Sequence, residues 1–169
     1  MRRLALIPAR GGSKRVPRKN LADIGGRTLV EHAIASAAPC DAAWVSTDDD
    51  EIARVALDMG ARVRRRPAMY CRDESSTEDV IVDWLAHLAA LGERVDVVAL
   101  LQPTSPLRTA RHVEEALELL ASTDSDSVTS VTVSHTHHFA GRLIPTQPGR
   151  APRWRPDRLW TYRPRTQTV

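Results

Sequence analysis

Short apolar runs alternate along this chain with segments whose apolar residues recur at helical spacing. The runs that predict strands lie at residues 4–8, 43–46, 62–64, 95–101 and 127–133. The continuous apolar run at 95–101 is typical of a central strand covered on both faces. Strands that alternate with helices in this way predict an α/β domain with a mainly parallel sheet.

Four helices are expected between these strands, each opened by a side chain that can cap the first turn. The capping residues are Thr28 with Glu31, Asp48 with Glu51, Ser75 or Ser76, and Thr109. Gly60 is placed to end the second helix, because glycine readily adopts the left-handed conformation that follows many helices. The pattern therefore predicts the helix boundaries as well as the buried faces.

The pattern changes after residue 133. Helical periodicity stops, and prolines interrupt a segment rich in arginine and tryptophan. We therefore divide the chain into an α/β core at residues 1–133 and a basic segment at 134–169, which is either an arm that packs on another surface or a partly ordered tail.

The amino-acid composition argues against several classes of protein. The chain has 169 residues, 42% hydrophobic and 27% charged, which suits one globular domain. Cys40 and Cys71 are the only cysteines and lack metal-ligand spacing, so a disulfide scaffold and a structural zinc site are not expected. No apolar run approaches the ~18 residues of a membrane span. We expect a cytoplasmic protein without membrane association.

Charge is distributed unevenly around the net value of +3. Residues 127–169 contain seven arginines and one acidic residue, Asp157, whereas residues 1–126 are slightly acidic. Such a basic segment suits a nucleic acid, an anionic small substrate or a partner chain. The only lysines, Lys14 and Lys19, both lie in the loop after the first predicted strand.

That loop, residues 8–20, has the composition of a phosphate cradle. Glycines allow backbone N–H groups to approach a ligand, and five cations surround them at the carboxyl end of a strand. Neither the Walker A pattern nor GxGxxG is present. A solvated basic loop is the alternative.

Four blocks of sequence, in order, resemble the CMP–sialic acid synthetase (acylneuraminate cytidylyltransferase) family. They are PARGGSKRVPRKNL from Pro8, STDD from Ser46, RPA from Arg66 with Asp73 and SST from Ser75, and LQPTSPLRT from Leu101. The resemblance extends from residue 4 to about residue 133. It implies a three-layer α/β/α Rossmann-like nucleotidyltransferase fold with a protruding dimerisation arm.

The resemblance also implies roles for individual residues. Those that would bind the nucleotide are Arg10, Gly11, Gly12, Ser13, Lys14, Lys19, Asn20, Arg66 and Thr77. Arg10 and Lys19 would be catalytic, through the triphosphate. Those that would face the sugar acid are Gln102, Ser105, Arg108 and Arg165. Asp48 is the candidate ligand of Mg²⁺, which suits chemistry on phosphates.

The implied reaction transfers CMP from CTP to a 2-keto sugar acid of the sialic-acid type and releases pyrophosphate. Pseudaminic, legionaminic or phosphonate acids are alternative acceptors, and a nucleotide-binding remnant without turnover is another alternative. The resemblance implies a homodimer completed by the basic arm, and no nucleic-acid partner. Relatives continue toward an aspartate pair that binds magnesium, whereas no acidic residue follows Asp157 here.

Several of these residues have a simpler structural explanation. Asp48 could only cap a helix, Ser75 to Thr77 could only begin one, and Arg108 could be a solvated charge beside one. His135, His137 and His138 lack the spacing of a metal site. Trp154 and Trp160 among arginines could stack on single-stranded nucleic acid, but a dimer interface suits them better.

Overall fold

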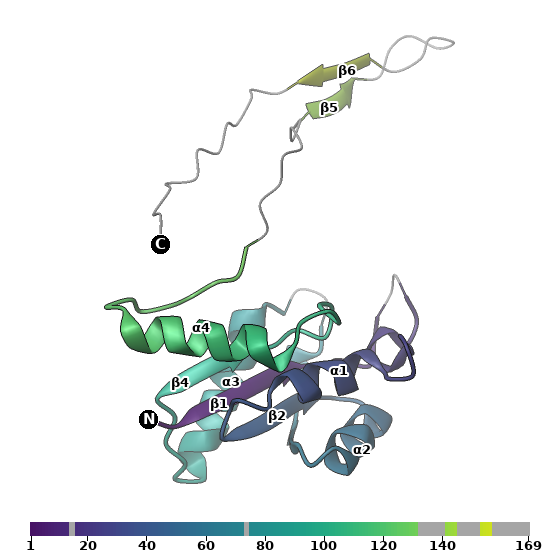
Figure 1. Ribbon diagram of the computed structural model, residues 1–169. Helices are drawn as coiled ribbons and strands as arrows, with labels where there is room; N and C mark the ends of the chain where they lie inside the picture. The colour runs from purple at the N-terminus through teal and green to yellow at the C-terminus, as the bar shows by residue number, and fades with distance from the viewer. Residues whose placement is uncertain (14–15, 73–74, 132–140, 145–152, 157–169) are drawn as a thin grey trace. The chain divides into compact units, whose positions relative to one another are not determined.

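A computed structural model describes residues 1–13, 16–72, 75–131, 141–144 and 153–156. The chain divides into two units, Met1–Ser130 and Val131–Val169. The elements of the first unit are β1 (Arg3–Pro8), η1 (Lys19–Leu21), α1 (Leu29–Ser36), β2 (Ala42–Thr47), α2 (Asp50–Asp58), β3 (Arg62–Arg65), η2 (Ala68–Tyr70), α3 (Thr77–Ala90), β4 (Val97–Leu100) and α4 (Ala110–Ser122). Figure 1 shows their arrangement. In the second unit, β5 (Gly141–Ile144) pairs antiparallel with β6 (Arg153–Pro156).

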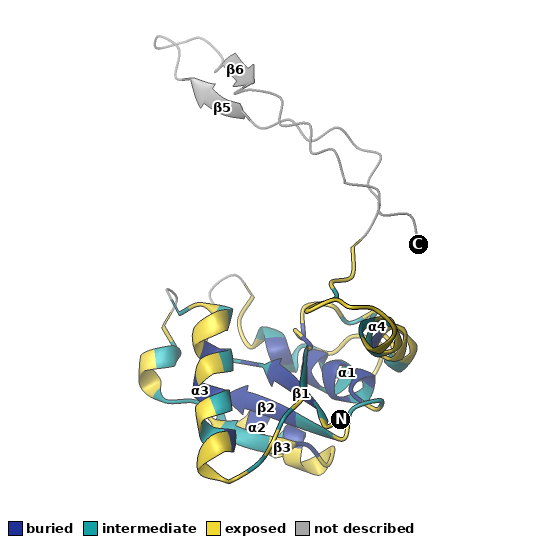
Figure 2. Cartoon of the chain, turned by 90° about the vertical axis from the view of Figure 1, so that its left-hand side faces the viewer, coloured by how far each residue is buried: buried dark blue, intermediate teal, exposed yellow. Residues whose placement is uncertain are grey.

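The first unit is built on a parallel sheet with strand order β3-β2-β1-β4. Helices α1, α2 and α4 pack on one face of the sheet, and α3 packs on the other (Figure 2). This arrangement is the three-layer α/β/α architecture that the resemblance implied, and the predicted α/β class with a parallel sheet is confirmed.

Strand β1 separates two hydrophobic clusters because successive side chains point to opposite faces. Ala5 and Ile7 join the cluster under α1, α2 and α4. Leu4 and Leu6 instead join the cluster that contains Trp84 of α3. All four β1 residues are fully buried, so this strand is the centre of the core.

Most predicted helix starts are observed. The side chains of Thr28 and Glu31 form the predicted capping box at α1, and Ser76 caps α3. Gly60 follows α2 with a φ of 77°, in the left-handed region that favours glycine. The predicted cap of α2 is wrong by one residue: Asp49, with extended backbone, accepts hydrogen bonds from the first-turn N–H groups, whereas the side chain of Asp48 has another partner.

Two strand predictions are corrected. Strand β4 is shorter than the predicted 95–101 and lies at the edge of the described sheet, where Leu100 is 38% exposed. Residues 127–131 form no strand, and Val131 is 86% exposed. Residues 132 and 133 lie outside the described ranges. Valines among serines and threonines favour a strand only when a neighbouring strand pairs with them and buries one face.

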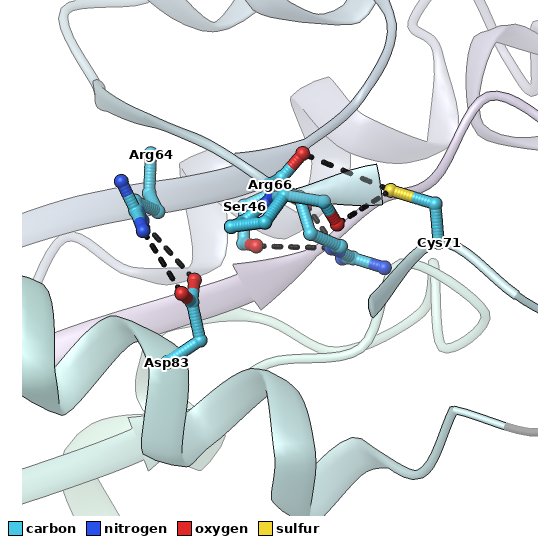
Figure 3. Close-up of polar contacts among 6 residues, drawn as sticks. Ser46, Arg64, Arg66, Cys71 and Asp83 are labelled. Atoms are coloured by element: carbon cyan, nitrogen blue, oxygen red, sulfur yellow. Dashed lines mark hydrogen bonds and ion pairs between the residues drawn. The ribbon is translucent and has the colours of Figure 1, made fainter. Parts of the chain in front are cut away.

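An ion pair joins the edge of the sheet to α3. Arg64 of β3 donates from Nε and Nη2 to the two carboxylate oxygens of Asp83, at 3.1 and 2.9 Å (Figure 3). Asp83 is only 9% exposed, so the fork of the guanidinium replaces the water that its carboxylate loses on folding. None of the helices in the described part of the chain has the length and apolarity needed to cross a bilayer.

Asp83→Ala is expected to lower the free energy of unfolding by about 3 kcal/mol, because it leaves the Arg64 guanidinium without its buried partner. Glu115→Ala is the matched control: it breaks the exposed pair with Arg111 within α4 and should cost less than ~1 kcal/mol. Urea unfolding of the two variants and the parent chain measures both losses. Equal losses would contradict a special contribution from the Arg64–Asp83 pair.

Candidate functional site

A pocket of about 240 Å³ lies at the carboxyl ends of the parallel strands. Pro8 is the last residue of β1, Arg66 directly follows β3, and Gln102 comes two residues after β4. The lining residues are Pro8, Arg10, Ser13, Lys19, Asn20, Arg66, Tyr70, Arg72, Ser75, Ser76, Thr77, Val80, Gln102, Pro103 and Thr104. The chain order reverses between β1 and β4, the point at which open α/β sheets bind ligands.

The loop after β1 contributes four of the predicted nucleotide-binding residues to this pocket: Arg10, Ser13, Lys19 and Asn20. Asn20 is 6% exposed, and its side-chain amide donates to the carbonyl oxygen of Arg10 at 2.8 Å. This bond closes the loop across ten residues. Asn20 therefore holds the backbone that carries Arg10, in addition to lining the pocket itself.

The backbone before Lys19 is held in an unusual conformation. Arg18 has a φ of 53° and a ψ of 32°, in the left-handed region that a non-glycine residue adopts at a cost of about 1–2 kcal/mol. Its guanidinium forms an ion pair with Glu51 of α2. The turn that this conformation produces begins η1 and brings Lys19 to the pocket.

Gly11 packs against the start of α2. Its N–H donates to the Asp48 carboxylate at 2.9 Å. A Cβ atom at position 11 would lie 2.8 Å from the Cβ of Asp49, whose side chain is held by its capping bonds. Glycine is therefore required at position 11 by close approach, whereas a Cβ at Gly12 would meet nothing within 4 Å. Neither glycine lines the pocket.

Arg66 lies against the end of β2. Its Nη2 donates to the carbonyl oxygen of Ser46 at 2.7 Å, and its Nε donates to the hydroxyl of the same residue at 3.1 Å (Figure 3). Burial lowers the pKa of Arg66. The Cys71 thiol donates to the carbonyl of Pro67 at 3.3 Å, and burial raises the pKa of that thiol. Arg66 thus lines the pocket from a fixed position.

The first turn of α3 forms another wall of the pocket, through Ser75, Ser76 and Thr77. Ser76 and Asp79 form a capping box in which each side chain accepts a backbone N–H of the other, at 3.1 and 2.9 Å. The simpler explanation of the serines as a helix start is correct for Ser76. The same turn also faces the pocket, where the positive end of the helix dipole favours an anion.

The loop after β4 divides into a part that lines the pocket and a part that does not. Gln102 and Thr104 line the pocket, whereas Ser105 and Arg108 are not among the lining residues. Arg108 donates from Nε to the hydroxyl of buried Ser36 and from Nη2 to the carbonyl of Gln102, both at 3.1 Å. Burial lowers the pKa of Arg108. Arg108 is therefore an anchor between this loop and α1 and not a solvated charge.

Among the lining residues that no predicted binding block contains are Tyr70 and Arg72. They lie between the RPA and SST blocks, in a segment with one turn of 3₁₀ helix and no periodicity. The sequence feature that could have identified them is the presence of an aromatic residue and a cation between two predicted binding blocks.

Among the described residues, the lining contains four cations, Arg10, Lys19, Arg66 and Arg72, and no carboxylate. Like charges that face one open pocket repel each other, and a polyanion removes this repulsion on binding. The hydroxyl and amide groups around them can orient a ligand by hydrogen bonds. This arrangement suits a phosphorylated ligand with a polar second part.

The described residues do not provide a magnesium site of their own. Among them, no group of three histidine, cysteine, aspartate or glutamate side chains is placed to hold a metal ion. Asp48, the predicted ligand, contributes a single carboxylate, and one of its oxygens accepts the Gly11 N–H. We therefore assign no step of the chemistry to a metal.

Some predicted residues lie outside the described ranges. They are Lys14, Arg165, the histidines at 135, 137 and 138, and Trp160. Trp154 lies on β6, for which the backbone alone is described. The predicted dimerisation arm and its contribution to the site stay predictions.

The fold matches solved nucleotidyltransferases. A CMP:2-keto-3-deoxy-manno-octonic acid synthetase in complex with CTP has a TM-score of 0.59 and 28% identity, and the match covers 72% of this chain and 48% of that one. A cytidylyltransferase from Leptospira borgpetersenii serovar Hardjo-bovis has a TM-score of 0.54 and 21% identity, over 73% of this chain and 50% of its own. The first unit therefore has the nucleotidyltransferase fold.

Sequence comparison defines the family. A family model described as cytidylyltransferase matches residues 4–141, and the chain belongs to this family, as the resemblance predicted. The N-acylneuraminate cytidylyltransferase of Oncorhynchus mykiss is 39% identical over 153 residues, which are 85% of this chain and 34% of that protein. The CMP-N,N'-diacetyllegionaminic acid synthase of Legionella pneumophila is 40% identical over 123 residues, 70% of this chain and 53% of that protein. The chain thus spans between a third and about half of these relatives.

Gly11→Ala is expected to lower the free energy of unfolding by about 2 kcal/mol, because the new Cβ displaces Asp49 from its capping position. Gly12→Ala adds the same methyl group one residue later, in open space, and should change stability by less than ~0.5 kcal/mol. Thermal unfolding followed by circular dichroism compares the two. A Gly12→Ala loss as large as that of Gly11→Ala would show that the packing against α2 is not the cause.

Proposed function

We propose that this chain binds CTP in the pocket at the carboxyl ends of β1, β3 and β4 and transfers CMP to a 2-keto sugar acid. The observation that supports this most directly is the lining itself. Four cations face one pocket, without a carboxylate among the described lining residues, in a chain of the cytidylyltransferase family. A solved neighbour with the same fold is a CMP-sugar-acid synthetase in complex with CTP.

Arg10, Ser13 and Lys19 hold the triphosphate in this proposal. A hydroxyl oxygen of the acceptor attacks the α-phosphorus, the bond from that phosphorus to the bridging oxygen breaks, and pyrophosphate leaves. The hydroxyl proton passes to solvent. The two cations stabilise the negative charge that builds up on the departing pyrophosphate, and positioning contributes the remainder, as in other phosphoryl-group transfers. Lys14 and the glycines at 11 and 12 are proposed to assist from the same loop.

The nucleoside lies toward the other predicted contacts. Asn20, Arg66 and Thr77 line the pocket together and are proposed to contact the ribose and cytosine. Arg66 is fixed by its bonds to Ser46, so it can present a constant hydrogen-bonding surface to the base. A site built to hydrogen-bond one base discriminates against others, and we therefore propose CTP over UTP.

The acceptor is proposed to be an acid sugar of the sialic-acid type, bound by the loop that begins at Gln102. Relatives act, by their names, on N-acylneuraminate and on diacetyllegionaminic acid. Legionaminic, pseudaminic or phosphonate acids are therefore the alternative acceptors. Ser105 and Arg165 remain predicted acceptor contacts, and Arg108 is proposed to position the loop that begins at Gln102. A homodimer remains the proposed assembly, and Mg²⁺ remains a proposed cofactor that rests on the resemblance.

A second candidate function is CTP binding without turnover. It is favoured by the lack of a group of three metal-ligating side chains among the described residues. The two candidates share the nucleotide pocket and differ in the release of pyrophosphate.

The activity is tested by pyrophosphate release from CTP and Mg²⁺ with a panel of keto-sugar acids. We expect release with at least one acid, and none when the acid is omitted. Binding of CTP without release for any acid would establish the second candidate. A preference for UTP or dTTP over CTP would contradict the proposed nucleotide.

Lys19→Ala is expected to weaken CTP binding at least tenfold, because a charge-assisted hydrogen bond to phosphate contributes about 1.5–3 kcal/mol. Arg54→Ala removes a cation from the exposed surface of α2, outside the pocket, and should leave the affinity unchanged. Isothermal titration calorimetry measures both. An unchanged affinity in Lys19→Ala would contradict the proposed role of Lys19 in nucleotide binding.

A further inference from the structure

Arg72 is a pocket cation to which neither the sequence motifs nor the resemblance assigned a role. It lies in the segment between β3 and α3, four residues before the Ser76 cap. Its side chain is exposed to solvent and lines the pocket together with Arg10, Lys19 and Arg66. The position combines access for a ligand with proximity to the three predicted cations.

The backbone of Arg72 is held from two sides. Its carbonyl oxygen accepts a hydrogen bond from Nη1 of Arg10 at 3.4 Å and another from the N–H of Ser75 at 3.2 Å. The first bond joins the loop after β1 to the segment before α3, across 62 residues of sequence. Arg10 and Arg72 are therefore neighbours whose positions depend on each other.

The charge of Arg72 is not neutralised within the described residues. None of them forms an ion pair with its guanidinium or accepts a hydrogen bond from it, whereas Arg64 is paired with Asp83 and Arg66 is bonded to Ser46. An arginine fork that faces a pocket whose described lining contains no carboxylate is suited to a phosphate, which it can contact through two N–H groups.

We propose that Arg72 is an additional nucleotide-binding residue, which contacts the polyphosphate of the bound nucleotide beside Arg10. This inference rests on the proposed function. Arg10 connects Arg72 to the proposed triphosphate contacts. Its guanidinium reaches the backbone of Arg72, and its own loop contains Ser13 and Lys19. A phosphate chain that reaches Arg10 therefore also lies within the neighbourhood of Arg72. The acceptor carboxylate is assigned instead to the side of Gln102.

The test compares ligands that contain phosphate with one that does not. Isothermal titration calorimetry is run on the whole chain and on Arg72→Gln with CTP, inorganic pyrophosphate and cytidine. We expect Arg72→Gln to weaken the binding of CTP and of pyrophosphate about tenfold, as for the loss of one charge-assisted hydrogen bond. The affinity for cytidine should stay unchanged. Its CTP affinity should also fall less steeply with added salt, because one charge has been removed from the site.

Two further variants separate a ligand contact from a general effect. Arg72→Lys keeps the charge without the fork and should recover part of the affinity. Arg54→Gln removes an exposed cation on α2 and should bind CTP like the parent chain. Circular dichroism of all variants checks that the fold is retained.

The remaining outcomes are decisive. Unchanged CTP affinity in Arg72→Gln, or an equal loss for cytidine, overturns the proposal. A raised KM for the acid acceptor with unchanged CTP affinity also overturns it and assigns Arg72 to the acceptor. If the parent chain binds pyrophosphate but not CTP, the proposed function fails, and the pyrophosphate titration still decides on Arg72 as a phosphate contact. Binding of neither ligand overturns both.

Discussion

The pocket depends on the close contact between the loop after β1 and the start of α2. Gly11 approaches Asp49 so closely that no Cβ fits, and its N–H is bound by Asp48. Asp49 at the same time caps α2, so one short turn ends a strand, begins a helix and fixes the loop. The position of Arg10 follows from this contact, because Arg10 directly precedes Gly11 in the loop.

Backbone carbonyls and a hydroxyl group orient two cations of the pocket. Arg10 is tied to a carbonyl of the opposite segment, and Arg66 to a serine hydroxyl and carbonyl. The carbonyl and hydroxyl acceptors at Arg66 orient that cation without neutralising it, as a carboxylate would. Asp48 and Asp49 lie beside the loop after β1, but they accept backbone N–H groups and do not line the pocket. Among the described residues, the scaffold therefore orients Arg66 without pairing it with a carboxylate.

Periodicity and capping predicted the elements well where a local signal decides them, as at Thr28 with Glu31 and at Ser76. Both signals failed where the formation or the burial of a strand depends on its neighbouring strands. The apolar run at 95–101 predicted a strand covered on both faces, but β4 lies at the edge of the described sheet and is only partly buried. Residues 127–131 lack a strand to pair with among the described residues. Motif blocks found most of the pocket lining. Arg72 was missed because it lies in an irregular segment, where only the folded chain shows what a residue faces.

Arginine identity alone does not distinguish binding from structural roles in this chain, which has 24 basic residues of which two are lysine. Arg108 belongs to the same motif block as Gln102, yet its guanidinium is used to hold the loop against Ser36. Arg72 belongs to no block, yet it faces the pocket. The difference lies in the acceptors around each side chain: a guanidinium whose N–H groups already reach buried acceptors has few left for a ligand. The hydrogen bonds of each arginine therefore distinguish the structural role of Arg108 from the phosphate contact that we propose for Arg72.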